Sequence, residues 1–76
     1  MKVTANVYVS TPQVHTLKHC FDAEVSSMQT PRSTIAMHVT KDTLEFNVTA
    51  TDPTALRATL HTITKLLDVF EKAAKE

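Results

Sequence analysis

The sequence lacks glycine and tryptophan altogether, and it has one cysteine, Cys20, among its 76 residues. Without glycine, the chain cannot form the glycine-rich loops that cradle phosphates. A single cysteine excludes an internal disulfide, so the chain does not fit the small secreted domains that disulfides stabilise, and a reducing compartment such as the cytoplasm is expected. Lys+Arg and Asp+Glu both number 8. The resulting zero net charge excludes the strongly basic character of an autonomous nucleic-acid-binding domain.

Long apolar runs are also absent. No run approaches the roughly 18 residues of a membrane span, and no signal-peptide pattern opens the chain. At 76 residues, the chain is predicted to form one small domain over residues 1–76. A domain of this size buries only about 60% of the surface of its unfolded chain, so it often depends on a partner for stability.

Three segments alternate apolar and polar residues, a pattern typical of strands with one buried face. They cover residues 1–10, 33–40 and 43–50. Lys41 and Asp42 are expected to form the hairpin tip between the last two. The third segment has the bulkiest apolar set, which predicts that it is the central strand.

Two helices are predicted, because two prolines each follow residues suited to capping a helix. The first begins near Pro12 and runs to about Phe21 or Val25, before a polar loop. The second begins near Pro53 and runs to about Lys75. The predicted fold is therefore α+β with the order β-α-β-β-α: a three-stranded antiparallel sheet with both helices on one face.

The second helix carries a wide uncharged arc. At about 100° per residue, one row falls within a sector of about 80° and is predicted to face the core: Leu56, Leu60, Ile63, Leu67, Phe70 and Ala74. A second row lies beside it: Ala55, Thr59, Thr62, Leu66, Val69 and Ala73. Together the rows approach about 180°, wider than one sheet face usually requires. Either the first helix covers the second row or a partner's helix packs on it.

The residues that could carry chemistry do not form a recognisable site. His15 and His19 lie one helical turn apart, but a catalytic zinc site needs three protein ligands. Cys20 with His19 or His38 could form a nucleophile pair, yet no third member is visible. We therefore expect neither catalysis nor a bound cofactor or metal.

Three short motifs follow one another in the second half of the chain. They are Arg-Ser at residues 32–33, Leu-x-Phe-x-Val-x-Ala-x-Asp at 44–52, and Leu-Arg-Ala at 56–58. In this order and spacing they resemble the small Pcc-type subunit of the KEOPS (EKC) complex, and the first half fits that family more loosely, as a strand followed by a helix. The chain differs from the family pattern at His61, where asparagine is expected, and at the hairpin tip, which lacks the common glycine.

The resemblance implies a fold similar to KH-type domains and a role in making threonylcarbamoyladenosine in tRNA. In that complex an ASKHA-fold threonylcarbamoyl transferase performs the reaction, and the small subunit dimerises, docks its helices on the transferase and helps the complex hold tRNA. For this chain it implies a non-catalytic scaffold that binds the transferase and a second copy or paralogue of itself, with tRNA bound only within the complex and no membrane. Partner contacts are expected on the second helix, at Arg57, His61, Thr59, Thr62, Leu66 and Val69.

Other interpretations stay open. The chain could be a diverged paralogue that pairs with the standard small subunit, or a stand-alone KH-like RNA-binding module. KH domains clamp RNA with a GxxG loop, however, and this chain has no glycine. A small metal- or thiol-dependent enzyme would have to use His15, His19 and Cys20. Dimerisation is expected through an edge strand, either the first or the second.

Overall fold

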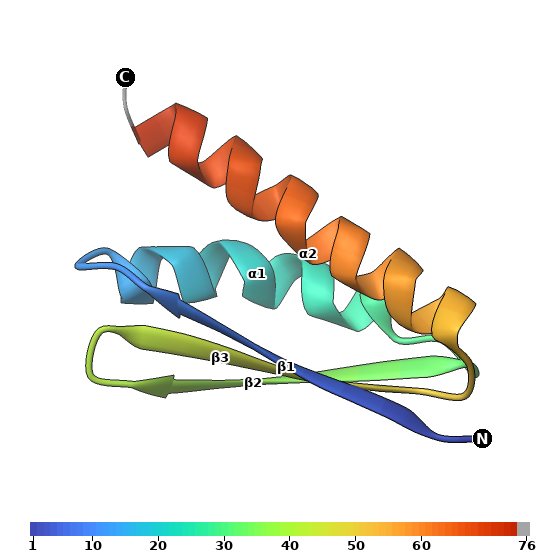
Figure 1. The fold of residues 1–76 in the computed structure, drawn as a ribbon. Coiled ribbons are helices and arrows are strands. Elements are labelled where there is room, and N and C mark those ends of the chain that lie inside the picture. The colour runs from blue at the N-terminus through green and yellow to red at the C-terminus, as the bar shows by residue number, and fades with distance from the viewer. Residues whose placement is uncertain (75–76) are drawn as a thin grey trace.

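The structure, a computed structural model, describes residues 1–74 and has the predicted α+β architecture (Figure 1). Its elements are β1 (Val3–Ser10), α1 (Val14–Met28), β2 (Ser33–Thr40), β3 (Thr43–Ala50) and α2 (Pro53–Ala74). The strands form one antiparallel sheet in the order β1-β3-β2, so the third strand is central, as predicted. Both helices lie on the same face of this sheet.

The hairpin between β2 and β3 turns at Lys41 and Asp42, as expected. Lys41 has φ 57°, a left-handed conformation that glycine usually adopts in such turns. The turn is held against the neighbouring strand, because the Thr11 N–H donates to the carbonyl of Asp42 at 2.8 Å. This hydrogen bond helps to hold the turn in which Lys41 adopts the left-handed conformation.

The first helix is longer than predicted and begins later. It starts at Val14 rather than Pro12, because the Thr11 hydroxyl accepts the Gln13 N–H in a local turn before the helix. It ends at Met28, so the polar stretch expected to be a loop is partly helical. Val25 and Met28 pack against the core and extend the buried side of the helix. The second helix begins at Pro53 as predicted, whereas its expected end at Lys75 lies outside the described residues.

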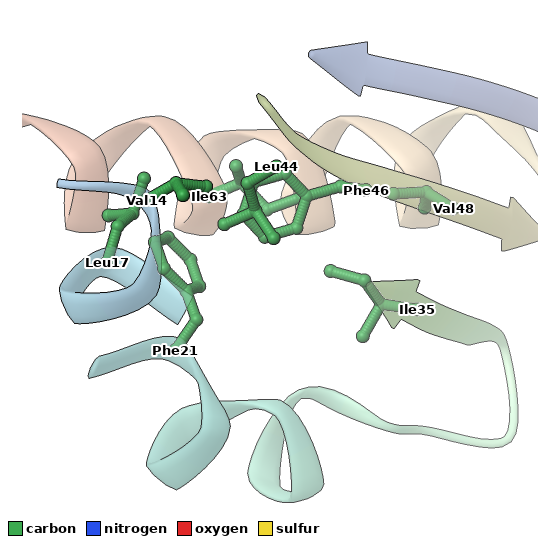
Figure 2. Packing of buried hydrophobic residues seen from close by; sticks show 8 residues of the cluster. All are labelled: Val14, Leu17, Phe21, Ile35, Leu44, Phe46, Val48 and Ile63. Carbon is green, nitrogen blue, oxygen red and sulfur yellow. The ribbon is translucent and has the colours of Figure 1, made fainter. Parts of the chain in front are cut away.

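The hydrophobic core lies between the sheet and the two helices (Figure 2). It comprises Val14, Leu17, Phe21, Ile35, Leu44, Phe46, Val48 and Ile63. The rings of Phe21 and Phe46 meet edge to face with centroids 4.8 Å apart, a favourable arrangement of two aromatic quadrupoles. The central strand β3 supplies three of the labelled core residues, and this explains why its apolar side chains are the bulkiest in the sheet.

Only part of helix α2 packs closely on this core. Its first half lies over the sheet, and toward its C-terminal end it rises away from the strands (Figure 1). Leu66, Leu67 and Phe70 in the second half are accordingly half-buried, although they touch the core. The second half of α2 therefore presents apolar side chains that this chain alone does not cover.

Candidate functional site

The start of α2 is fastened to the start of β2 by an ion pair. The carboxylate of Asp52 caps the helix, because its Oδ1 accepts the N–H of Ala55 at 2.8 Å. Its Oδ2 accepts hydrogen bonds from Nη2 and Nε of Arg32, at 2.6 and 3.2 Å. The pair is exposed, so it contributes little to the free energy of unfolding. The ion pair instead fixes the position of the start of α2 relative to the start of β2.

The pKa of Asp52 provides a test of this junction. The hydrogen bond from Arg32, followed by that from the Ala55 N–H, holds the pKa of this carboxyl below its ordinary value of 3.8. A lowered pKa means that the charged form stabilises the folded chain above that value, and the contribution is lost as pH falls through the folded-state pKa. Asp52→Asn keeps a cap acceptor but removes the charge.

We expect Asp52→Asn to lower the Tm at neutral pH. The difference from wild type should shrink as the pH is lowered below 3.8, because the wild-type carboxyl then loses its own charge. Thermal unfolding followed by circular dichroism across this range measures the difference. A Tm difference that stays constant with pH would show that the charge of Asp52 does not fasten the helix.

The side chain of Thr59, one of the predicted partner contacts, points into the protein. Thr59 is 7% exposed, and its hydroxyl donates to the hydroxyl of Ser33 at 3.0 Å. Ala55 is also buried, one turn earlier. These small residues allow the first half of α2 to approach its own sheet closely.

The burial of Ala55 and Thr59 rotates α2 relative to the predicted orientation. Of the row expected to face the core, Ile63 is fully buried, whereas Leu56 and Leu60 pack against the core but are only half-buried. Leu56 and Leu60 line a shallow hollow together with exposed Arg57 and His61. Arg57 and His61 therefore line a different hollow from the one that Thr62 lines.

The remaining predicted contacts form a row on the side of α2 that faces α1. Thr62, Leu66 and Val69 follow one another at intervals of four and three residues, which places them on one helix face. Thr62 and Leu66 are half-buried, and Val69 is 57% exposed. Thr62 lines a hollow of about 470 Å³ between the two helices. We call the row Thr62, Leu66 and Val69 the α2 contact row.

A second hollow, of about 550 Å³, lies on the other side of the C-terminal half of α2. Val9 of β1 and Leu17 of α1 line one side of it, and Leu67 and Phe70 of α2 line the other. Sequence reasoning assigned Leu67 and Phe70 to the core and so missed this surface. Only the rise of α2 away from the sheet exposes it, and no local sequence signal indicates that rise.

The described residues contain no group of three or more His, Cys, Asp or Glu side chains arranged to hold a metal ion. His15, His19 and Cys20 are exposed on α1. Within residues 1–74, the helices are too short or too polar to cross a membrane. The surface of α2 carries apolar side chains bordered by charged and hydroxyl side chains.

Comparison with known proteins gives one family. The family model described as transcription factor Pcc1 matches residues 2–75, which is nearly the whole chain. No curated protein matches the sequence. The match includes both halves of the chain, among them the strand β1 and helix α1 that carried the weaker part of the resemblance.

Proposed function

Because this chain belongs to the Pcc1 family, the family of the KEOPS small subunit, we propose that it is a non-catalytic scaffold subunit of that complex. The family supports an association with KEOPS. The proposal further states that the chain docks on the ASKHA-fold threonylcarbamoyl transferase and dimerises. It supports the modification of tRNA without performing the reaction. Its location would be the cytoplasm, where an exposed free cysteine such as Cys20 remains reduced.

The observation that carries the docking proposal is the exposed α2 contact row. Val69 is 57% exposed and Leu66 is half-buried. Thr62, one turn before Leu66, lines the hollow between the helices. An apolar row beside a groove between two helices suits another protein's helix, which would pack its own side chains between them. A transferase that presents helices has the shape this surface requires, and tRNA would then be held by the assembled complex.

Dimerisation supports the scaffold role because a dimer can bring two transferase copies together. The family's small subunit dimerises, and this chain could pair with a second copy or with a paralogue. The departure at His61 lines a different hollow from the one that Thr62 of the contact row lines. A difference at that position is therefore compatible with the proposed docking.

The proposal is tested by mixing the pure chain with the transferase from the same source and measuring mass by light scattering. We expect a stable complex that contains two copies of this chain. A dimer that ignores the transferase would contradict the docking step and favour a diverged paralogue. A monomer that binds no transferase would contradict the scaffold role as a whole.

A further inference from the structure

Strand β2 forms one edge of the sheet, and the residues just before it in the chain reach across that edge. In an antiparallel sheet, the backbone groups of successive residues point alternately to the two sides of the strand. Arg32, directly before β2, faces the β3 side, because its carbonyl accepts the N–H of Thr51 at 2.9 Å. By alternation, the backbone groups that face outward from β2 belong to Ser33, Ile35, Met37 and Val39.

A tight turn over residues 30–33 supplies a partner to the first of these outward residues. Thr30 and Ser33 exchange backbone hydrogen bonds at 2.9 and 3.3 Å. Pro31 suits the second position of such a turn, because its ring fixes φ near about −65°. The Thr30 hydroxyl also accepts the N–H groups of Arg32 and Ser33, at 3.2 and 3.0 Å. Thr30 therefore pairs with β2 as a residue of an additional strand would.

Gln29 continues this pairing with its side chain. If an additional strand extended from Thr30, the next residue to exchange backbone bonds with β2 would be Met28, opposite Ile35. Met28 is the last residue of α1, so its backbone is helical and cannot pair there. The Gln29 carboxamide takes the position instead: its Nε2 donates to the carbonyl of Ile35 at 2.8 Å, and its Oε1 accepts the Ile35 N–H at 3.0 Å. A carboxamide has the donor and acceptor of a peptide group, so it completes the same pair of bonds.

The sequence of β2 has none of the features that usually keep an edge strand from pairing. Its eight residues, STIAMHVT, include no proline and no Asp, Glu, Lys or Arg. It also pairs with β3 in unbroken register, without a bulge. Uncharged segments rich in β-branched residues are the ones that readily add to one another as strands. Protection of this edge therefore has to come from outside the strand.

The Gln29 contact determines how much of the β2 edge is left for another strand. Of the four outward residues, only Met37 and Val39 have outward groups without a hydrogen-bond partner in the part of the chain that the structure describes. An incoming strand that paired with Met37 would meet the Gln29 side chain before it reached Ile35. Two residues give a short ladder, whereas withdrawal of Gln29 would extend it to three.

We propose that the Gln29 carboxamide is a built-in block on strand addition: it closes the β2 edge, and without it a second copy of this chain would add there, β2 against β2. The occupant is a second copy because β2 is complementary to itself. When two β2 strands lie antiparallel about Ala36, outward residues meet outward residues, and Ile35 of each copy pairs with Met37 of the other. This block concerns β2 alone and does not depend on the proposed docking to the transferase.

Amide hydrogen exchange tests whether the contact is formed in solution. In the wild-type chain we expect the amide of Ile35 to be protected at least about 10-fold more than those of Met37 and Val39, because it alone is hydrogen-bonded at this edge. Gln29→Ala should remove most of that difference at low protein concentration. Protection of the wild-type Ile35 amide no greater than that of Met37 would overturn the proposal, because the contact would not be populated.

Light scattering over a series of concentrations tests the block itself. We expect Gln29→Ala to form species of about twice the wild-type mass and above, in a fraction that grows with concentration. Gln13→Ala is the matched control, since Gln13 lies at the other end of α1, is exposed and makes no side-chain capping bond. A Gln29→Ala protein with wild-type masses at every concentration would overturn the closing role of Gln29.

A second substitution separates strand addition from general misfolding. Ala36→Lys places a charge in the middle of β2, on its exposed face, where two paired copies would bring like charges opposite one another. Combined with Gln29→Ala, it should restore the wild-type masses. Heavier species that persist in the double variant would overturn the proposal, because they would have to form at another surface.

Discussion

Ile63→Ala is expected to lower the free energy of unfolding by about 2–5 kcal/mol. The Ile63 side chain is 0% exposed and belongs to the core cluster beneath α2, so its removal leaves a cavity that the surrounding strands cannot fill. Domains are typically stable by only about 5–15 kcal/mol, and one of this size lies near the lower end. Urea unfolding followed by circular dichroism should therefore show a midpoint shifted far toward zero denaturant.

Leu60→Ala is the matched control for this prediction. Leucine and isoleucine lose the same number of carbon atoms on replacement by alanine, but Leu60 is half-buried and lines a surface hollow. Its loss should cost less than half as much free energy as that of Ile63, because part of the removed surface is already in water. Equal costs for the two variants would contradict the orientation of α2 described above.

The strands could be predicted from sequence because their signal is local. Each alternates apolar and polar residues, and β3, with Leu44, Phe46 and Val48 buried, is recognisable as the central strand. The start of α2 could also be predicted, since Asp52 caps it directly before Pro53. These features depend on residues close together in the chain, so no knowledge of the tertiary structure is needed.

The end of α1 was predictable but was missed. Val25 and Met28 follow Phe21 at intervals of four and three residues, which continues the buried face of the helix. The polar residues between them, Ser26 and Ser27, are exposed on the other side. The polar composition of this stretch predicts a loop, whereas its periodicity continues the helix, and the structure follows the periodicity.

The orientation of α2 could not be predicted in this way. Ala55 and Thr59 are buried because the helix approaches the sheet closely there, and the partner of the Thr59 hydroxyl is Ser33, 26 residues away. Large residues usually indicate the core side of a helix, and Leu56 and Leu60 do pack against the core, but they stay half-buried because the close approach to the sheet is made by the small residues beside them. The side-chain amide of Gln29 also donates to the carbonyl of Ile35 and accepts its N–H, and no sequence pattern indicates this contact.

The α2 contact row leads to the second large expected effect, on binding rather than stability. Val69→Glu is expected to weaken binding of the transferase by at least about 30-fold, because a carboxylate would be buried without a partner at an apolar contact. The fold should be unaffected, since Val69 is 57% exposed and lies outside the core cluster. Isothermal titration calorimetry with the pure transferase measures the affinity, and unfolding in urea checks the stability.

Ala36→Glu is the charge-matched control for Val69→Glu. Ala36 is exposed on β2, and its alternation with buried Ile35 places it on the sheet face away from both helices. The Ala36→Glu substitution therefore adds the same charge to the chain without touching the contact row, and we expect wild-type affinity for the transferase. If Ala36→Glu weakened binding as much as Val69→Glu, net charge would explain the loss. If neither variant weakened it, the transferase would have to dock elsewhere, and the hollow lined by Leu67 and Phe70 would be the next surface to test.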